Sequence, residues 1–174
     1  MMAQQASIFS INLMITLRPL VPEDLPKLEW YGQYTHFRNV YARTYEEHCI
    51  GRRLMLVAVL NNFPIGQVFL HLALGHNQEK HKRGYLYALR VIEHLQGLGI
   101  GTRLIHYAEQ NLIERDFEIA MISAAKTNIR ARQLYERLGY HVIGEDEGRW
   151  QYMNHRGEVV QMHEPCWILE KNLR

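Results

Sequence analysis

Short apolar runs separated by turn-forming residues predict the strands of this chain. Residues 54–60 are a continuous apolar run of strand length, and a turn at 61–64 leads into a second such run at 65–70, so these segments predict a hairpin. Residues 15–20 alternate in the manner of a half-buried strand. The same criteria predict further strands at 84–91, 118–123, 140–144, 149–153, 159–163 and 167–170, with a turn at 154–157.

Helical patterns occupy the segments between these strands. A helix is predicted to begin at Pro22, and residues 27–52 predict two helices interrupted near 32–36. Residues 99–115 and 128–138 each carry an apolar stripe of helical spacing, and a glycine at 139 is placed to end the second of them. The elements together predict an α/β (α+β) domain, with a mixed central sheet of six to seven strands and about four helices.

A glycine-rich turn joins the strand at 84–91 to the helix at 99–115. Gly97, Gly99 and Gly101 stand at alternate positions in this turn. Glycine lets the backbone approach a ligand closely, and the unpaired N–H groups of a first helical turn point toward negative charge. The turn therefore predicts a binding site for a phosphate-bearing molecule.

The glycine spacing narrows the choice of ligand. Counted from Gly97 and from Gly99, the third glycine of a dinucleotide fingerprint would fall on Thr102 and Leu104, so that fingerprint is absent. A P-loop is also excluded, because its terminal Gly-Lys-Ser/Thr does not follow. A tight turn that binds nothing is the alternative interpretation.

Composition restricts the class of protein. A length of 174 residues with 47% hydrophobic and 22% charged side chains is typical of a single globular domain. The net charge of +2 and the scattered basic residues argue against a nucleic-acid partner, and no apolar stretch reaches the roughly 18 residues of a membrane span. Two distant cysteines, Cys49 and Cys166, favour a reducing, cytoplasmic setting.

The N-terminal segment does not have the pattern of a signal peptide, because it lacks a basic start and a small-residue cleavage site. We predict a flexible tail over residues 1–13 and the folded domain over 14–174. Either Met1 or Met14 is compatible with being the first residue of the working protein.

Two segments resemble the motifs of a known family. Gln96-x-x-Gly99-x-Gly101 is similar to the acetyl-CoA-binding signature of the GNAT superfamily of N-acetyltransferases. The segment from Asn128 to Tyr140 resembles that family's Asn-x-x-Ala-x-x-Leu-Tyr-x-x-x-Gly-(Phe/Tyr) motif, and it lies one strand after the glycine-turn helix. The order of elements over about residues 15–170 also resembles the GNAT fold. The resemblance implies acetyl-CoA as co-substrate, with no metal ion.

The resemblance also implies a set of site residues. The backbone amides of seven consecutive residues would hold the coenzyme pyrophosphate: Gln96, Gly97, Leu98, Gly99, Ile100, Gly101 and Thr102. The main chain of Leu89, Arg90 and Val91 would bond the pantetheine arm, at a point where the family's two central strands separate. Asn128 would hydrogen-bond the same arm, and Tyr135 would donate its phenolic proton to the leaving sulfur, as the catalytic residue. A phenol titrates near pH 10, so it remains protonated at neutral pH.

The general base is left open by the sequence. Histone-type members of the family carry a glutamate on the strand before the glycine turn, and Tyr85 stands at the corresponding position. Glu93 occupies the place of a proline common in the family and is one alternative. Carboxylates acting through water on the C-terminal strands are others: Glu145, Asp146, Glu147 and Glu164.

Other side chains bear on metal binding and on the acceptor. His76 and His81 share a polar loop without cysteines or carboxylates in ligand spacing, so no zinc site is predicted. An aromatic set in the first helical region either lines the acceptor side or is helix core, and we expect core for at least half of it: Trp30, Tyr31, Tyr34, His36, Phe37, Tyr41 and Tyr45. The run at 145–147 is either a solvated turn or a site that attracts a cationic amine.

The predicted function is acetyl-CoA-dependent transfer of an acetyl group to an amine of a small molecule, peptide or protein. The alternative is a non-catalytic module of the same fold that binds coenzyme A or acyl-CoA as a sensor or an interaction partner. No nucleic-acid or membrane partner is predicted, and the chain is expected to be a monomer or a homodimer.

Overall fold

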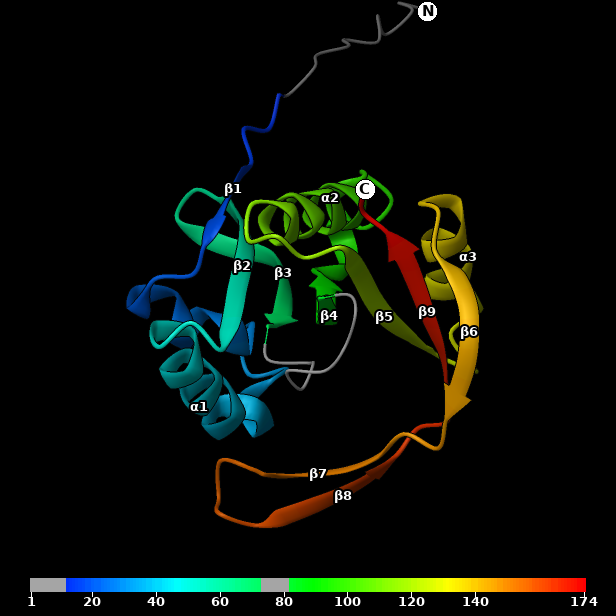
Figure 1. Ribbon diagram of the computed structural model, residues 1–174. Coiled ribbons are helices and arrows are strands. Elements are labelled where there is room, and N and C mark those ends of the chain that lie inside the picture. Colours follow the sequence, from blue (N-terminus) through cyan, green and yellow to red (C-terminus); the bar gives the residue numbers. More distant parts are fainter. Residues whose placement is uncertain (1–11, 73–81) are drawn as a thin grey trace, which may run out of the picture.

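A seven-stranded mixed sheet forms the centre of the protein (Figure 1). The computed structural model describes residues 12–72 and 82–174. The strand order is β1-β2-β3-β4-β5-β9-β6, and β4 and β5 are the parallel pair. The strands are β1 (Thr16–Pro19), β2 (Arg53–Leu60), β3 (Phe63–His71), β4 (Arg83–Val91), β5 (Ile119–Ala125), β6 (His141–Asp146) and β9 (Cys166–Asn172). The predicted fold class is therefore confirmed.

The helical elements of the described chain comprise three α-helices and three short 3-10 segments. The α-helices are α1 (Arg38–Cys49), α2 (Ile100–Ile113) and α3 (Ile129–Arg137), and the 3-10 segments are η1 (Pro22–Glu29), η2 (Thr35–Phe37) and η3 (Glu93–Leu95). The predicted interruption between two helices is confirmed, because the backbone turns left-handed at Trp30, Tyr31 and Gly32 and ends η1 there. Gly139 follows α3 with φ +91°, as expected of a residue that ends a helix.

The two faces of the sheet carry separate apolar cores because side chains alternate along each strand. On β2, Leu54, Leu56 and Ala58 belong to a core that includes α2 and α3, whereas Met55 and Val57 face a second core that includes η1 and α1. The packing of α2 is especially close at Gly84, where an added Cβ would lie 2.3 Å from the Leu112 side chain. Figure 1 shows α2 and α3 on one side of the sheet and α1 on the other.

Two strands predicted from the sequence form a separate ribbon. β7 (Arg149–Met153) and β8 (Val159–His163) pair only with each other, and most of their side chains are exposed, so burial does not draw them into the main sheet. The predicted turn at 154–157 is confirmed by a hydrogen bond from the Gly157 N–H to the Asn154 carbonyl at 3.0 Å. The ribbon reaches across to α1, where Asn39 Nδ2 donates to the same carbonyl at 2.6 Å (Figure 1).

Two sequence predictions lie wholly or largely outside the described residues. Most of the segment predicted as a tail, residues 1–13, precedes residue 12, and the loop with His76 and His81 falls in the second gap. Across the described ranges, no helix has both the length and the apolar character needed to span a membrane. The same ranges contain no group of three or more potential metal-ligating side chains.

Candidate active site

Strands β4 and β5 separate part-way along their length. Their parallel pairing runs from Arg83 opposite Ile119 to Leu86 opposite Ile122 and ends there, although β4 continues to Val91 and β5 to Ala125 (Figure 1). Beyond Leu86, β4 pairs only with β3, and beyond Ile122, β5 pairs only with β9. This separation leaves strand edges that an extended ligand such as a pantetheine arm can pair with. The predicted residues Leu89, Arg90 and Val91 lie along the β4 edge.

A bulge interrupts β4 at the point of separation. The register with β3 shifts between Gln67 and Phe69, and Ala88 takes a left-handed conformation with φ +51°. Gln67, only 1% exposed, donates from its side-chain amide to the Ala88 carbonyl at 3.3 Å. Because the amide satisfies a backbone carbonyl freed by the bulge, Gln67 positions the site. Sequence reasoning missed Gln67, and its one signal was a polar side chain within the apolar run at 65–70.

The glycine turn leaves its surface open to a ligand. Gly97 and Gly99 both have φ +80°, and a Cβ added to either would meet no described atom within 4 Å. Helix α2 begins at Ile100 with no side-chain cap from the described residues, so its first N–H groups face outward. The Gln96 side chain holds the turn by donating to the Val91 carbonyl at 2.9 Å, and the Gln96 N–H donates to Glu93. The backbone amides available to a pyrophosphate therefore start at 97 and not at 96.

Substitution of Gly99 by alanine should raise the Kd for acetyl-CoA by about 10-fold, because a left-handed backbone costs a non-glycine residue roughly 1–2 kcal/mol and the amides would shift. Calorimetric titration of the folded variant measures this. Gly157→Ala is the matched control, since Gly157 has φ +81° and equally open space but lies in the ribbon turn. Equal Kd values for the two variants would contradict a ligand at the turn.

The predicted catalytic residue Tyr135 is 5% exposed and packs near Tyr140, with ring centroids 6.3 Å apart. Burial, and then the neighbouring Tyr85, raise the pKa of the Tyr135 phenol to about 12. In the described part of the chain, its hydroxyl has no hydrogen-bond partner. The phenol is therefore a protonated donor with its proton uncommitted, as the predicted role requires.

Asn128 begins helix α3. Its side-chain oxygen accepts the Ala131 N–H at 3.1 Å, which is the geometry of a helix N-cap. The oxygen is thus committed to the fold, and the NH₂ group remains for the predicted bond to the pantetheine arm.

Tyr85 stands on β4 at the position that corresponds to the glutamate of histone-type family members. Its hydroxyl makes a short hydrogen bond to the Ser123 hydroxyl across the separating strands, and burial raises the pKa of its phenol. Tyr85 is therefore a neutral donor at neutral pH rather than a carboxylate base. Ser123 was missed by sequence reasoning, because the pairing depends on strands 38 residues apart.

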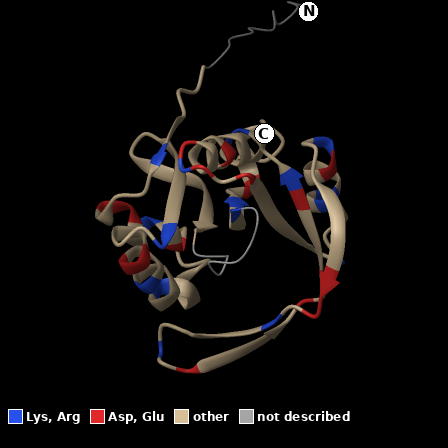
Figure 2. Cartoon of the chain, viewed as in Figure 1, with Lys and Arg blue, Asp and Glu red and all other residues tan. Residues whose placement is uncertain are grey.

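The acidic alternatives for the base all lie on the exposed surface: Glu93, Glu145, Asp146, Glu147 and Glu164. Glu145 pairs with Lys126, and Glu147 with His163 at 3.0 Å. The acidic run at 145–147 lies where β6 leads into β7 (Figure 2). These contacts favour the solvated-turn interpretation of 145–147. A buried carboxylate base at the separated strands is absent from the described residues, whose buried acids are Asp24 and Glu109.

The aromatic set of the first helical region divides into buried core residues and residues that remain partly or fully exposed. Trp30 and Tyr41 are buried, and Tyr31 is 91% exposed and stacks on Phe63. Tyr34, His36 and Phe37 are partly exposed between α1 and the ribbon, where the Phe37 ring lies 4.9 Å from that of Tyr152. Burial, followed by the charge of Arg90 and His155, lowers the pKa of His36. The ribbon thus packs against the η2 segment on the α1 face of the sheet.

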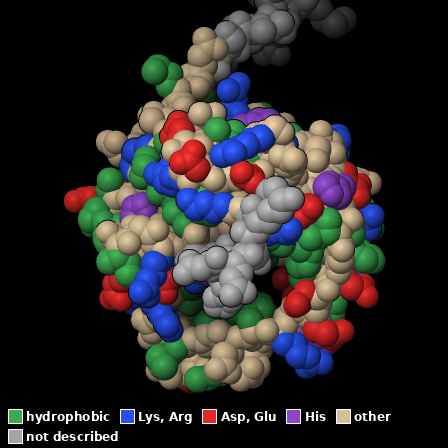
Figure 3. Space-filling view, viewed as in Figure 1, with side chains coloured by type: hydrophobic (Ala, Val, Ile, Leu, Met, Phe, Trp, Pro, Cys, Tyr) green, Lys and Arg blue, Asp and Glu red, His purple; other side chains and the backbone are tan. Residues whose placement is uncertain are grey.

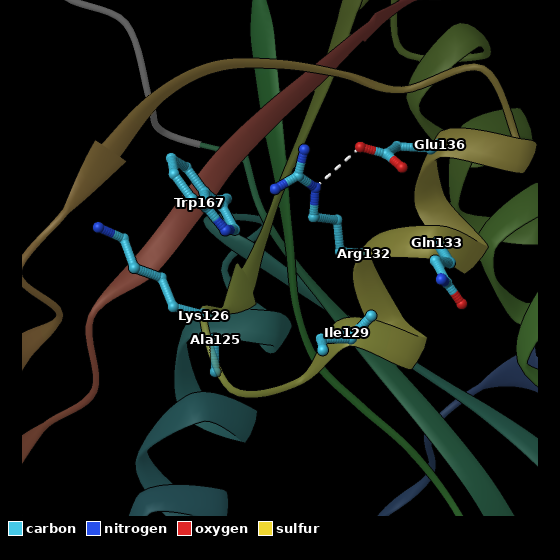
Figure 4. A pocket seen from close by; sticks show the side chains of 7 residues that line it. All are labelled: Ala125, Lys126, Ile129, Arg132, Gln133, Glu136 and Trp167. Atoms are coloured by element: carbon cyan, nitrogen blue, oxygen red, sulfur yellow. Dashed lines mark hydrogen bonds and ion pairs between the residues drawn. The ribbon is translucent and has the colours of Figure 1, made fainter.

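A separate surface pocket of about 260 Å³ lies beside α3 (Figure 4). It is lined by Ala125, Lys126, Ile129, Arg132, Gln133, Glu136 and Trp167. Lys126 and Arg132 lie over the Trp167 ring at 4.6 and 5.1 Å from its centroid, and both pair with carboxylates. This pocket contains none of the residues predicted to bind the coenzyme. On the face seen in Figure 3, charges of both signs are interspersed, so no single-sign patch suggests a polyanionic partner there.

A family model decides the classification. The model described as "Acetyltransferase (GNAT) family" matches residues 21–140, which include the separated strands, the glycine turn and the whole of the second motif. The chain belongs to the GNAT acetyltransferase family. The resemblance seen in the sequence is therefore confirmed, and acetyl transfer from acetyl-CoA is the general chemistry of this GNAT domain. No curated protein matches the chain.

Solved structures share the GNAT fold at low sequence identity. The ribosomal-protein-S18-alanine N-acetyltransferase of Escherichia coli is 19% identical, with a TM-score of 0.70, over 92% of this chain and 94% of that protein. Arabidopsis thaliana NAA60 in complex with acetyl-CoA is 18% identical, with a TM-score of 0.71, over 91% and 98% of the two chains. A NatC complex bound to Gag peptide and CoA contains a chain that is 19% identical, with a TM-score of 0.70, over 92% of this chain and 99% of that chain.

Proposed function

We propose that this protein transfers the acetyl group of acetyl-CoA to an amine of a small molecule, peptide or protein. The observation that carries the proposal is the buried phenol of Tyr135, whose pKa of about 12 keeps its proton in place beside strands that separate to admit a ligand. A module that only bound the coenzyme would need the open turn but no uncommitted proton donor. The donor therefore favours catalysis over the sensor interpretation.

The residues of this chain have distinct parts in the proposed reaction. Acetyl-CoA supplies the thioester. The turn from Gly97 to Thr102 fits its phosphates, since the helix start provides free N–H groups and the glycines leave room above the backbone. The edge of β4 orients the pantetheine arm, and the bulge held by Gln67 turns the local backbone out of the ladder with β3.

The proton balance follows from the same side chains. The unprotonated amine nitrogen forms a bond to the acetyl carbon, and the carbon–sulfur bond breaks. The nitrogen then gives up a second proton to water, and the sulfur takes a proton from water to leave as the free thiol of CoA. Tyr135 donates a hydrogen bond to the sulfur as negative charge develops there. No buried carboxylate stands at the separated strands among the described residues, so the ammonium proton leaves to water, along the side lined by Tyr85 and Ser123. Transfer thus depends on the fraction of acceptor that is already unprotonated.

The neighbours support an amine on a peptide or protein as one form of the acceptor. Two of them are a ribosomal-protein-S18-alanine N-acetyltransferase and a NatC complex bound to a Gag peptide. A small-molecule amine offers the same nucleophile and remains the other form of the proposed acceptor.

An acceptor screen tests the proposed function. Purified protein is incubated with acetyl-CoA and a panel of amino acids, polyamines, aminoglycosides and peptides, and both free thiol and acetylated product are measured. We expect stoichiometric thiol and N-acetyl product with at least one class of amine. Tight binding of acetyl-CoA with no product from any amine would instead identify a coenzyme-binding module.

A further inference from the structure

The Arg90 side chain is enclosed by aromatic residues of the η2–α1 segment. Its guanidinium carbon lies 4.5 Å from the ring centroid of Tyr34 and 4.8 Å from that of Phe37. One terminal nitrogen donates to the Tyr41 hydroxyl at 3.0 Å. These contacts fix the plane of the guanidinium, and Arg90 remains partly exposed.

This cation has no counter-charge in the described part of the chain, where no carboxylate lies within 4.0 Å of it. Other arginines that lie over aromatic rings are paired: Arg53 with Glu47, and Arg132 with Glu136 at 2.8 Å. Taking a cation partly out of water is costly without a partner, and cation–π contacts offset only part of that cost. Since a guanidinium has five N–H donors and one is used here, Arg90 has unused donors.

Arg90 lies on the acceptor side of the sheet and not on the phosphate side. Tyr34 and Phe37 pack against the core of the α1 face, whereas α2, which starts at the glycine turn, packs on the opposite face. The ribbon packs on the same segment, with its Tyr152 and Trp150 rings 4.9 and 6.5 Å from the Phe37 ring. On β4, Arg90 comes two residues after the bulge at Ala88, where the strands have separated.

We propose that Arg90 binds a carboxylate of the acceptor, so that the substrates are amines that also carry a carboxylate group. A planar guanidinium held by rings presents paired N–H donors that match the two oxygens of a carboxylate. Free amino acids and peptides with an acidic residue near the N-terminus both supply this chemistry. The proposal rests on the proposed N-acetyltransferase function and specifies its substrate class.

Matched acceptors test the proposal. Each amino acid is compared with its carboxamide, and each peptide beginning with Asp or Glu with its Asn or Gln counterpart, by kcat/KM for acetylated product, with the concentration of each acceptor expressed as that of its unprotonated amine. We expect the wild-type protein to favour the carboxylate member by roughly 10- to 100-fold, the range of a charge-assisted hydrogen bond. In Arg90→Gln the preference should fall to within about 3-fold, and Arg90→Lys should keep part of it. The pair series that shows the preference identifies amino acid or peptide as the source of the carboxylate.

A control variant separates recognition from structure. Arg43→Gln removes the same charge from an exposed position on α1 and should leave the preference intact. If Arg90→Gln lowers kcat/KM for both members of each pair equally, Arg90 only braces the aromatic segment and the proposal is wrong. Equal use of carboxylate and amide by the wild-type protein overturns it without any variant. If no amine of either kind is acetylated, the proposed function fails as well.

Discussion

Replacing Tyr135 by phenylalanine should lower kcat by about 100-fold, while the Kd for acetyl-CoA changes by less than about 2-fold. The substitution removes only the hydroxyl, which has no hydrogen-bond partner among the described residues, so the fold loses little. What is lost is the donor to the sulfur at the moment when the carbon–sulfur bond breaks. Initial rates of thiol release at saturating substrates, with calorimetric Kd values, measure both quantities.

The control for this variant is Tyr107→Phe, which removes a phenol from a partly buried position on α2. Its kcat should stay within about 2-fold of wild type. An unchanged kcat in Tyr135→Phe would remove Tyr135 from the catalytic role. Because the pKa of Tyr135 is about 12, ionisation of this phenol should not lower the rate until the pH approaches that value.

Substitution of Glu109 by alanine should destabilise the fold by about 3–5 kcal/mol. Glu109 is 6% exposed on α2, and its carboxylate accepts the Tyr140 hydroxyl at 2.9 Å and the Lys171 ammonium at 2.9 Å. These bonds join α2 to the residue that precedes β6 and to β9. The variant would leave the Lys171 charge and the Tyr140 hydroxyl without their partner.

Urea unfolding followed by circular dichroism measures this loss. Glu136→Ala, which removes a carboxylate from a largely exposed pair with Arg132, should cost less than about 1 kcal/mol and serves as the matched control. A Glu109→Ala variant as stable as the control would show that the network is not stabilising. Glu109→Gln should lie between the two, because it keeps a hydrogen-bond acceptor but removes the charge opposite Lys171.

The sequence by itself determined the positions of the strands and helices and the two family motifs from which the coenzyme site is proposed. Strand and helix positions depend on local periodicity, and the glycine turn at 97–101 is a contiguous segment whose geometry follows from its own residues. The same holds for the motif from Asn128 to Tyr140. These features were predictable because each of them is specified by residues that are neighbours in the chain.

Only the tertiary structure decided which side chains meet at the acceptor end. The Tyr85–Ser123 bond, the support of the Ala88 carbonyl by Gln67, and the aromatic enclosure of Arg90 join residues 21 to 56 positions apart. The ribbon of β7 and β8 was predicted as two strands, but its separation from the sheet depends on which faces are buried, and periodicity does not specify that. Arg90 shows the difference most clearly, because the family resemblance predicts a role only for its main chain, whereas the role proposed for its side chain follows only from the packing of Tyr34, Phe37 and Tyr41 around it.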